Sequence, residues 1–266
     1  MQVISLIKNF FESKNIIEEL QKNLSSKLIE EIYINPKNIS KSIIKAKLQE
    51  TSYIKNVANT IDSFKEIDIE KYILDKMNSF EKNINYKMPD NAKIYVIIGL
   101  DTTTIYSIKF KDEDITILLL ESTNGYIDKL DMLLAHEFTH FIRRKILNKD
   151  IFEISIGERF ITEGIGCNYS EEIIANKNVY EYCLVKNEIV LWVKNNIDKL
   201  DEYIKNEKYK NDLMPCFFKM GAKTELENMP TRTGYVYGYY KVKEYLEKNN
   251  LKIKDIIGIN WEEILK

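Results

Sequence analysis

The pattern of apolar and polar residues divides the chain into a helical first part, a short stretch of strands and a second helical part. Within residues 1–86, apolar side chains recur three or four positions apart, as in the stripe Ile17, Leu20, Leu24 and Leu28. This spacing places the side chains on one face of an α-helix. We therefore expect an N-terminal helical region over residues 1–86, whose apolar stripes serve packing rather than chemistry.

The period of the pattern changes after the Met-Pro-Asp sequence at residues 88–90. Three short segments rich in β-branched and aromatic residues follow, and they predict strands at residues 93–100, 103–110 and 115–121. The charged residues 111–114 fit a hairpin loop between the second and third segments. The third strand is either a core strand or a sheet edge that holds an extended peptide by strand addition.

Helical periodicity returns at about Tyr126 and continues to about Leu147, and most of the remaining chain is helical apart from a break at residues 228–230. An order of helices, sheet and helices predicts an α+β fold. We expect an N-terminal helical region at residues 1–86 and a domain at residues 87–266. This second domain should be mostly helical, with a small antiparallel-rich sheet.

The expected helix at residues 126–147 contains the sequence HEFTH at residues 136–140. Histidines four positions apart project from one helix face, so the imidazoles of His136 and His140 can bind one metal ion. Glu137 lies beside this pair, where its carboxylate can take a proton from water that the metal activates. The chain has 2 histidines, and both belong to this motif. Random placement would rarely produce that arrangement, which favours a metal site over coincidence.

A catalytic zinc ion usually has three protein ligands and one open position for water. Both histidines are already used, so the third ligand must be a carboxylate, a thiolate or a less common donor. Glu163 is the best candidate, because the small residues Gly164 and Gly166 allow its helix to approach the first one closely. Glu158 is the alternative ligand. Cys167 shares a helix face with Glu163 and is either a small buried side chain or a group near the metal.

These motifs resemble those of the gluzincin metallopeptidases. HEFTH at residues 136–140, followed by FITEGIG at residues 160–166, is similar to the gluzincin pattern HExxH…[WF]-x-x-E-G-[FIL]-[AGS]. The resemblance implies that Glu163 is the third zinc ligand and that Phe160 fills the aromatic position. It also implies a zincin-like (gluzincin) catalytic domain over residues 87–266.

A third segment, GYVYGYYKVKEYL at residues 234–246, resembles the G-Y-x-x-G-Y-x-x-[IV]-x-x-Y-L stretch of a bacterial family of predicted zinc-dependent proteases. It is also similar to the Tyr-x-x-Gly segment of gluzincin aminopeptidases, in which the tyrosine donates a hydrogen bond to the oxyanion. The resemblance implies this role for Tyr235. The exopeptidase signature G-x-M-E-N of those aminopeptidases does not occur in the chain.

Elementary chemistry supports a tyrosine in that role. Hydrolysis through a tetrahedral intermediate needs a hydrogen-bond donor for the developing oxyanion. No histidine remains for it, so a tyrosine or an arginine must serve. Tyr235 is the first candidate, with Tyr239 and Arg232 as alternatives, although most of the 17 tyrosines should be packing or surface residues.

The composition narrows the choice of partners and compartment. The 39 basic and 41 acidic residues are mixed along the chain, which gives a net charge of −2 and no basic face for nucleic acid or a membrane. No apolar stretch approaches the roughly 20 residues that span a bilayer, and the N-terminus does not resemble a signal peptide. The 3 cysteines lack CxxC spacing, which argues against a disulfide framework. We expect a protein of a reducing compartment, most simply the cytoplasm.

Together these features predict a zinc-dependent peptidase that acts on a peptide or protein. Zn²⁺ would be held by His136, His140 and Glu163, with Glu137 as general base and Tyr235 as oxyanion donor. Two alternatives keep the zinc: a binding or regulatory module without turnover, and an amidase or esterase for a non-peptide substrate. A third alternative is a helical interaction protein in which HEFTH is a coincidence. The sequence leaves the oligomeric state and the choice between endo- and exopeptidase open.

Overall fold

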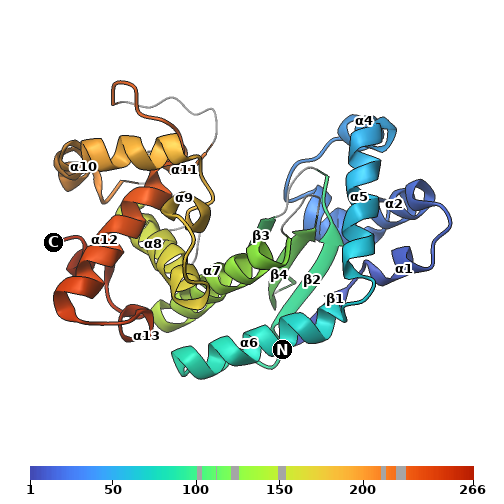
Figure 1. Ribbon diagram of the computed structural model, residues 1–266, viewed down its shortest axis with the longest axis horizontal. Coiled ribbons are helices and arrows are strands. Elements are labelled where there is room, and N and C mark those ends of the chain that lie inside the picture. Colours follow the sequence, from blue (N-terminus) through green and yellow to red (C-terminus); the bar gives the residue numbers. More distant parts are fainter. Residues whose placement is uncertain (101–103, 112, 121–125, 149–153, 211–213, 220–225) are drawn as a thin grey trace. The chain divides into compact units, whose positions relative to one another are not determined.

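The computed structural model describes most of the chain (Figure 1), namely residues 1–100, 104–111, 113–120, 126–148, 154–210, 214–219 and 226–266. Contacts within the chain divide it into two compact units. Unit 1 comprises residues 1–82 and 87–134, and unit 2 comprises residues 83–86 and 135–266. Helix α7 (Tyr126–Leu147) contributes residues to both units. The expected boundary between functional domains at residues 86 and 87 stays a prediction.

Unit 1 contains several helices, most of which place apolar side chains in its core. The helices are α1 (Lys8–Phe11), α2 (Ile16–Leu24), α3 (Lys27–Ile29), the π-helical turn η1 (Glu30–Ile34), α4 (Lys41–Gln49), α5 (Thr51–Phe64) and α6 (Ile69–Ile84). Helix α2 starts where the side chain of Asn15 accepts a hydrogen bond from the backbone N–H of Glu18, as an N-cap does. Of the expected stripe on α2, Leu20 and Leu24 are buried and Ile17 is exposed.

The sheet of unit 1 is mixed. It contains β1 (Gln2–Ser5), β2 (Lys93–Ile98), β3 (Thr104–Phe110) and β4 (Glu113–Leu120), in the order β1-β2-β4-β3. Strands β1 and β2 pair in parallel, as do β2 and β4, whereas β3 and β4 form an antiparallel hairpin. The α+β class is therefore confirmed, but the expectation of an antiparallel-rich sheet is wrong. The parallel pairs join segments remote in sequence, and local periodicity carries no information about such pairing.

Two further details of the sheet differ from the prediction. Residues 2–5 form a strand rather than part of a helix, because they pair with β2, which lies far from them in the sequence. The strand expected at residues 115–121 is not a sheet edge, since β4 lies between β2 and β3. Ile117 and Leu118, on opposite faces of β4, are both fully buried, which is typical of a central strand. The hairpin loop is also shorter than expected, because Glu113 already pairs with Phe110.

Unit 2 is helical and contains the residues of interest. Its helices after α7 are α8 (Ile156–Ile173), α9 (Val179–Tyr182), α10 (Asn187–Glu207), α11 (Met214–Phe218), α12 (Thr233–Asn249), α13 (Ile253–Ile256) and α14 (Trp261–Ile264). Helix α8 starts at Ser155, whose hydroxyl accepts a hydrogen bond from the backbone N–H of Glu158. In the parts of the chain described above, no helix combines the length and the apolar character needed to cross a bilayer.

Helices α8 and α12 touch through their backbones at two glycines. A Cβ on Gly164 would lie 2.2 Å from the carbonyl oxygen of Gly238, and a Cβ on Gly238 would lie 2.0 Å from that of Phe160. Any larger residue would force the helices apart, so the glycines are required by the close approach. This contact fixes the first turns of α12, which carry Tyr235, against the middle of α8, which carries Glu163.

Candidate metal centre

Helix α7 presents the two histidines of HEFTH from one face, as the four-residue spacing predicts. The ring centroids of His136 and His140 lie 4.4 Å apart, and the rings are nearly perpendicular, at 79°. Both side chains are largely buried. The hydroxyl of Thr139 donates a hydrogen bond of 2.7 Å to the carbonyl oxygen of His136. The two imidazoles therefore lie one helical turn apart on α7, with both Nε2 atoms turned the same way.

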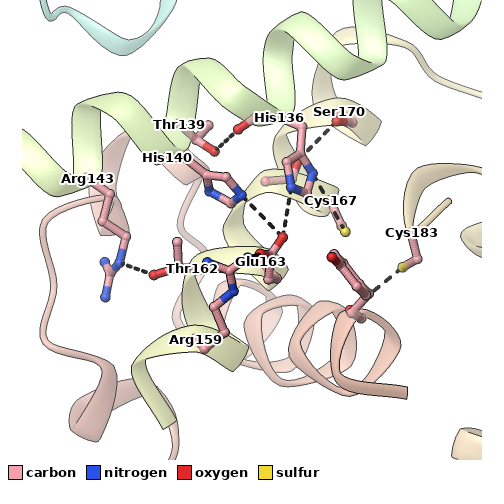
Figure 2. Close-up of polar contacts among 12 residues, drawn as sticks. His136, Thr139, His140, Arg143, Arg159, Thr162, Glu163, Cys167, Ser170 and Cys183 are labelled. Atoms are coloured by element: carbon pink, nitrogen blue, oxygen red, sulfur yellow. Dashed lines mark hydrogen bonds and ion pairs between the residues drawn. The ribbon is translucent and has the colours of Figure 1, made fainter. Parts of the chain in front are cut away.

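Helix α8 brings Glu163 to these imidazoles (Figure 2). Its Oε2 atom lies 3.0 Å from Nε2 of His136 and 3.2 Å from Nε2 of His140. One ligand atom from each of the three residues falls within 4.8 Å of the others, so the group can hold a metal ion. Two imidazole nitrogens and one carboxylate oxygen form a donor set that catalytic zinc sites use. The residues present thus fit a zinc ion, and all of them belong to unit 2.

Arg159 orients the carboxylate of Glu163 and was not identified from the sequence. Its Nη2 atom lies 2.5 Å from Oε1 of Glu163, one helical turn along α8. The two carboxylate oxygens therefore have different partners: Oε2 faces the histidines and Oε1 faces the guanidinium. Burial alone would raise the pKa of the Glu163 carboxyl, but Arg159 and the histidines hold it well below its usual range. The ionised form, which a metal ligand requires, is therefore favoured. The sequence contained one indication of this pair: Arg159 and Glu163 carry opposite charges four positions apart on an expected helix.

Glu158, the alternative third ligand, is engaged elsewhere. Its Oε1 atom accepts a 2.9 Å hydrogen bond from Nε of Arg143 and forms a 2.7 Å ion pair with Nη2 of the same residue. Thr162 also donates to this oxygen. The same guanidinium donates through Nη1 to the carbonyl oxygens of Ile257 and Ile259. Glu158 therefore pairs with Arg143, which in turn holds the C-terminal segment, and Glu158 does not belong to the metal-ligand group.

The residues after Glu163 shape the space around His136. A Cβ on Gly166 would lie 2.6 Å from Nδ1 of His136, so glycine leaves the room that this imidazole occupies. Cys167 is buried, and its Sγ atom lies 4.0 Å from the same Nδ1 atom (Figure 2). Cys167 is thus next to a candidate ligand without belonging to the ligand group. In metal sites the outer nitrogen of a histidine commonly has such a partner, which fixes the ring orientation.

Glu137 is 7% exposed and lies on α7 between the two histidines. Electrostatic interactions connect its side chain with His140 and with Arg159. Its carboxylate is not part of the group of atoms that can hold the metal. The structure therefore places an acidic group beside the candidate ligands but separate from them.

The three candidate oxyanion donors occupy different surroundings. The guanidinium of Arg159 interacts electrostatically with the phenol of half-buried Tyr235, and burial raises the pKa of that phenol to about 12. Tyr235 is therefore close to the carboxylate that Arg159 holds. The hydroxyl of Tyr239 donates instead to Glu171, at 2.8 Å. Arg232 lies over the Tyr235 ring, with Cζ 5.0 Å from the centroid.

In unit 2, the HEFTH motif of α7 lies against a buried glutamate of α8. This arrangement defines the class, a protein with a candidate HExxH metal site. The chain belongs to the family described as "Predicted Zn-dependent protease (DUF2268)", whose family model matches residues 67–266. The match spans the sheet from β2 onwards and the whole candidate metal centre. Searches among curated proteins and among solved structures gave no match.

Proposed function

We propose that the protein is a zinc-dependent peptidase of the gluzincin type, with the centre in unit 2 as its active site. The observation that carries the proposal is the convergence of His136, His140 and Glu163, whose ligand atoms lie within 4.8 Å of one another. Membership of a family of predicted zinc-dependent proteases supports the same function. The substrate would be a peptide or protein, and the evenly mixed charges favour neither nucleic acid nor a membrane as partner.

The three ligand residues would hold Zn²⁺. When bound, this ion would supply Lewis-acid activation of water and of the substrate carbonyl. The residues of the chain account for the other requirements of hydrolysis. Glu163 enters the site ionised because Arg159 neutralises its second oxygen. A ligand set with a single negative charge leaves the centre electrophilic, which suits activation of water.

Glu137 is the proposed general base and acid. Its carboxylate would accept a proton from the attacking water and then return one to the departing amine. Support comes from its buried position next to the ligand pair. A zinc site with a purely structural role has no use for a base there, and such sites are usually closed by cysteines. This argument favours an enzyme over a binding module without turnover.

Tyr235 is the proposed donor to the oxyanion. Its phenolic O–H is a neutral hydrogen-bond donor, and its neighbour Arg159 connects it with Glu163. Tyr239 is a weaker candidate, because its hydroxyl is committed to Glu171. A donor at this position would stabilise the transition state more than the substrate, which lowers the barrier.

The test combines metal analysis with digestion of a peptide library. We expect about one zinc ion per chain in the wild type and in Glu137→Gln, and much less in His136→Ala. The wild type should cleave peptides, whereas Glu137→Gln should retain zinc without cleaving. A strong chelator should abolish cleavage, and added zinc should restore it. Equal cleavage by wild type and Glu137→Gln would disprove the mechanism. Full zinc content without cleavage of peptides would instead favour a binding module or a non-peptide substrate.

A further inference from the structure

Arg232 is held in a conformation that arginine seldom adopts. Arg232 directly precedes the first residue of α12. Its own dihedral angles, φ 68° and ψ 16°, lie in the left-handed region. Most other residues of the described chain with positive φ, glycine aside, are asparagines, which tolerate this region better than long side chains. The side chain of Arg232 does not cap the helix. A backbone conformation of this kind is strained and is concentrated at binding and catalytic sites.

The guanidinium of Arg232 lies beside the proposed active site. Its Cζ atom is 5.0 Å from the centroid of the Tyr235 ring. The ring of Phe218 lies 5.3 Å from the same ring, between centroids. Tyr235 in turn interacts electrostatically with Arg159, which pairs with Glu163. An aromatic surface next to the metal centre thus carries a second guanidinium.

The two arginines differ in their charge balance. Arg159 is neutralised by Glu163 at 2.5 Å. Arg232 has no ion pair with any carboxylate in the described part of the chain, and it is only half-buried. A guanidinium offers parallel N–H donors that match a carboxylate, and partial burial strengthens such a pair. Within the described part of the chain, no carboxylate balances the positive charge of Arg232.

We propose that Arg232 binds a carboxylate of the substrate and makes the peptidase selective for peptides with a negative charge near the scissile bond. The inference rests on the proposed peptidase function and adds a substrate class to it. Two sources share this chemistry: the α-carboxylate at a peptide's C-terminus, and the side chain of aspartate or glutamate. This role gives a reason for the strained backbone conformation of Arg232, which would keep its guanidinium over the Tyr235 ring instead of in solvent.

The test uses pairs of peptides that differ in one charge. One pair carries a C-terminal carboxylate or a C-terminal amide, and further pairs carry Glu or Gln at each position around the cleaved bond. We expect the wild type to prefer the charged member of one kind of pair by about tenfold or more in kcat/KM, mainly through KM. The kind of pair that shows the preference identifies the source of the carboxylate.

Three variants separate recognition from folding. Arg232→Gln should lose the preference and keep full zinc content, and Arg232→Lys should retain part of it. Arg232→Gly should also lose the preference, yet unfold at a higher temperature than the wild type, because glycine adopts φ 68° without strain. Lys186→Gln removes a cation from another helix N-cap and should leave the preference unchanged.

A binding measurement makes the test independent of turnover. Fluorescent versions of the paired peptides are titrated into zinc-loaded Glu137→Gln protein and into the same protein with Arg232→Gln. With Arg232 intact, we expect the charged peptide to bind about tenfold more tightly than its neutral partner. With Arg232→Gln, the two peptides should bind equally. Equal cleavage or equal binding of every pair by proteins with Arg232 intact would overturn the proposal. If the wild type cleaves no peptide, the peptidase function fails, while the binding titration still decides the role of Arg232.

Discussion

Arg159 and Glu163 are paired along α8 so that the guanidinium meets one carboxylate oxygen at 2.5 Å, and the other oxygen faces both histidines. The ion pair thereby determines which oxygen is offered to a metal. It also balances a charge on a side chain that is only 2% exposed. A buried carboxylate without such a partner tends to take up a proton, which would weaken metal binding.

We predict that Arg159→Gln lowers the affinity for zinc by about 10–100-fold, the usual effect of removing the partner of a metal ligand. Arg159→Lys should have a smaller effect, because lysine keeps the charge but lacks the planar fork of donors. Competitive titration against a zinc chelator measures both affinities. An unchanged zinc affinity in Arg159→Gln would show that Glu163 is oriented by other contacts.

Gly166 and His136 provide a second prediction. A Cβ at position 166 would lie 2.6 Å from Nδ1 of the imidazole, so Gly166→Ala must displace the ring from the other ligands. We expect zinc affinity to fall while the folded structure, measured by circular dichroism, persists. Gly164→Ala is the matched control, because its Cβ would meet the backbone of Gly238 at 2.2 Å. That variant should lose stability in the metal-free state, since two helices must separate. The reverse pattern would contradict this division of roles.

The buried pair of Arg143 and Glu158 predicts a stability effect unrelated to metal. The two side chains are 1% and 2% exposed, so Arg143→Met leaves a buried carboxylate without the guanidinium that balances its charge. Thr162 still donates to this carboxylate, so we expect a loss of up to about 3–5 kcal/mol in the free energy of unfolding, measured by urea denaturation of the metal-free protein. Replacing Glu158 by Leu in the same chain should recover part of this loss. Lys65→Met, which breaks an exposed pair with Asp62, should cost at most about 1 kcal/mol.

Local spacing explains how much of the site the sequence could predict. His136 and His140 needed only helical geometry, and the small residues after Glu163 indicated that its helix could lie close to the first. Arg159 follows the same rule at four-residue spacing, but an acid–base pair on a helix is too common to indicate a ligand's partner. The contact between Arg159 and Tyr235 depends on how α8 packs against α12, which the sequence shows only through Gly164 and Gly238.

The sheet shows where local information ends. The β3–β4 hairpin was expected because its strands are neighbours in the chain. Strand β1 was missed because four residues with weak alternation become a strand only through parallel pairing with Lys93 and its neighbours. The same non-local pairing puts β4 in the interior of the sheet, where a peptide substrate has no free edge to join.

Glu172 gives the protein a pH dependence that does not involve the metal centre. Its Oε1 atom accepts a 3.0 Å hydrogen bond from the backbone N–H of Ile253. Partial desolvation raises the pKa of this carboxyl above its ordinary value of 4.5. The hydrogen bond from Ile253 and the charges of Lys252 and Lys243 oppose the shift, and Asp255 adds to it. A raised pKa means that the folded protein holds this proton more tightly than the unfolded chain does. The stabilising contribution is therefore complete below the ordinary value and is lost as pH rises through the folded-state pKa.

We predict that Glu172→Gln is more stable than the wild type at neutral pH, because glutamine keeps an oxygen acceptor for Ile253 and carries no charge to desolvate. The difference should shrink as the pH falls towards the ordinary value of 4.5, since the wild-type carboxyl is then protonated as well. Urea midpoints at a series of pH values measure this difference directly. Asp68→Asn removes the charge of an exposed carboxylate that accepts from the N–H of Lys71, and it serves as the comparison without burial. A gap between Glu172→Gln and wild type that widens towards acid pH would mean that the folded protein favours the ionised carboxylate.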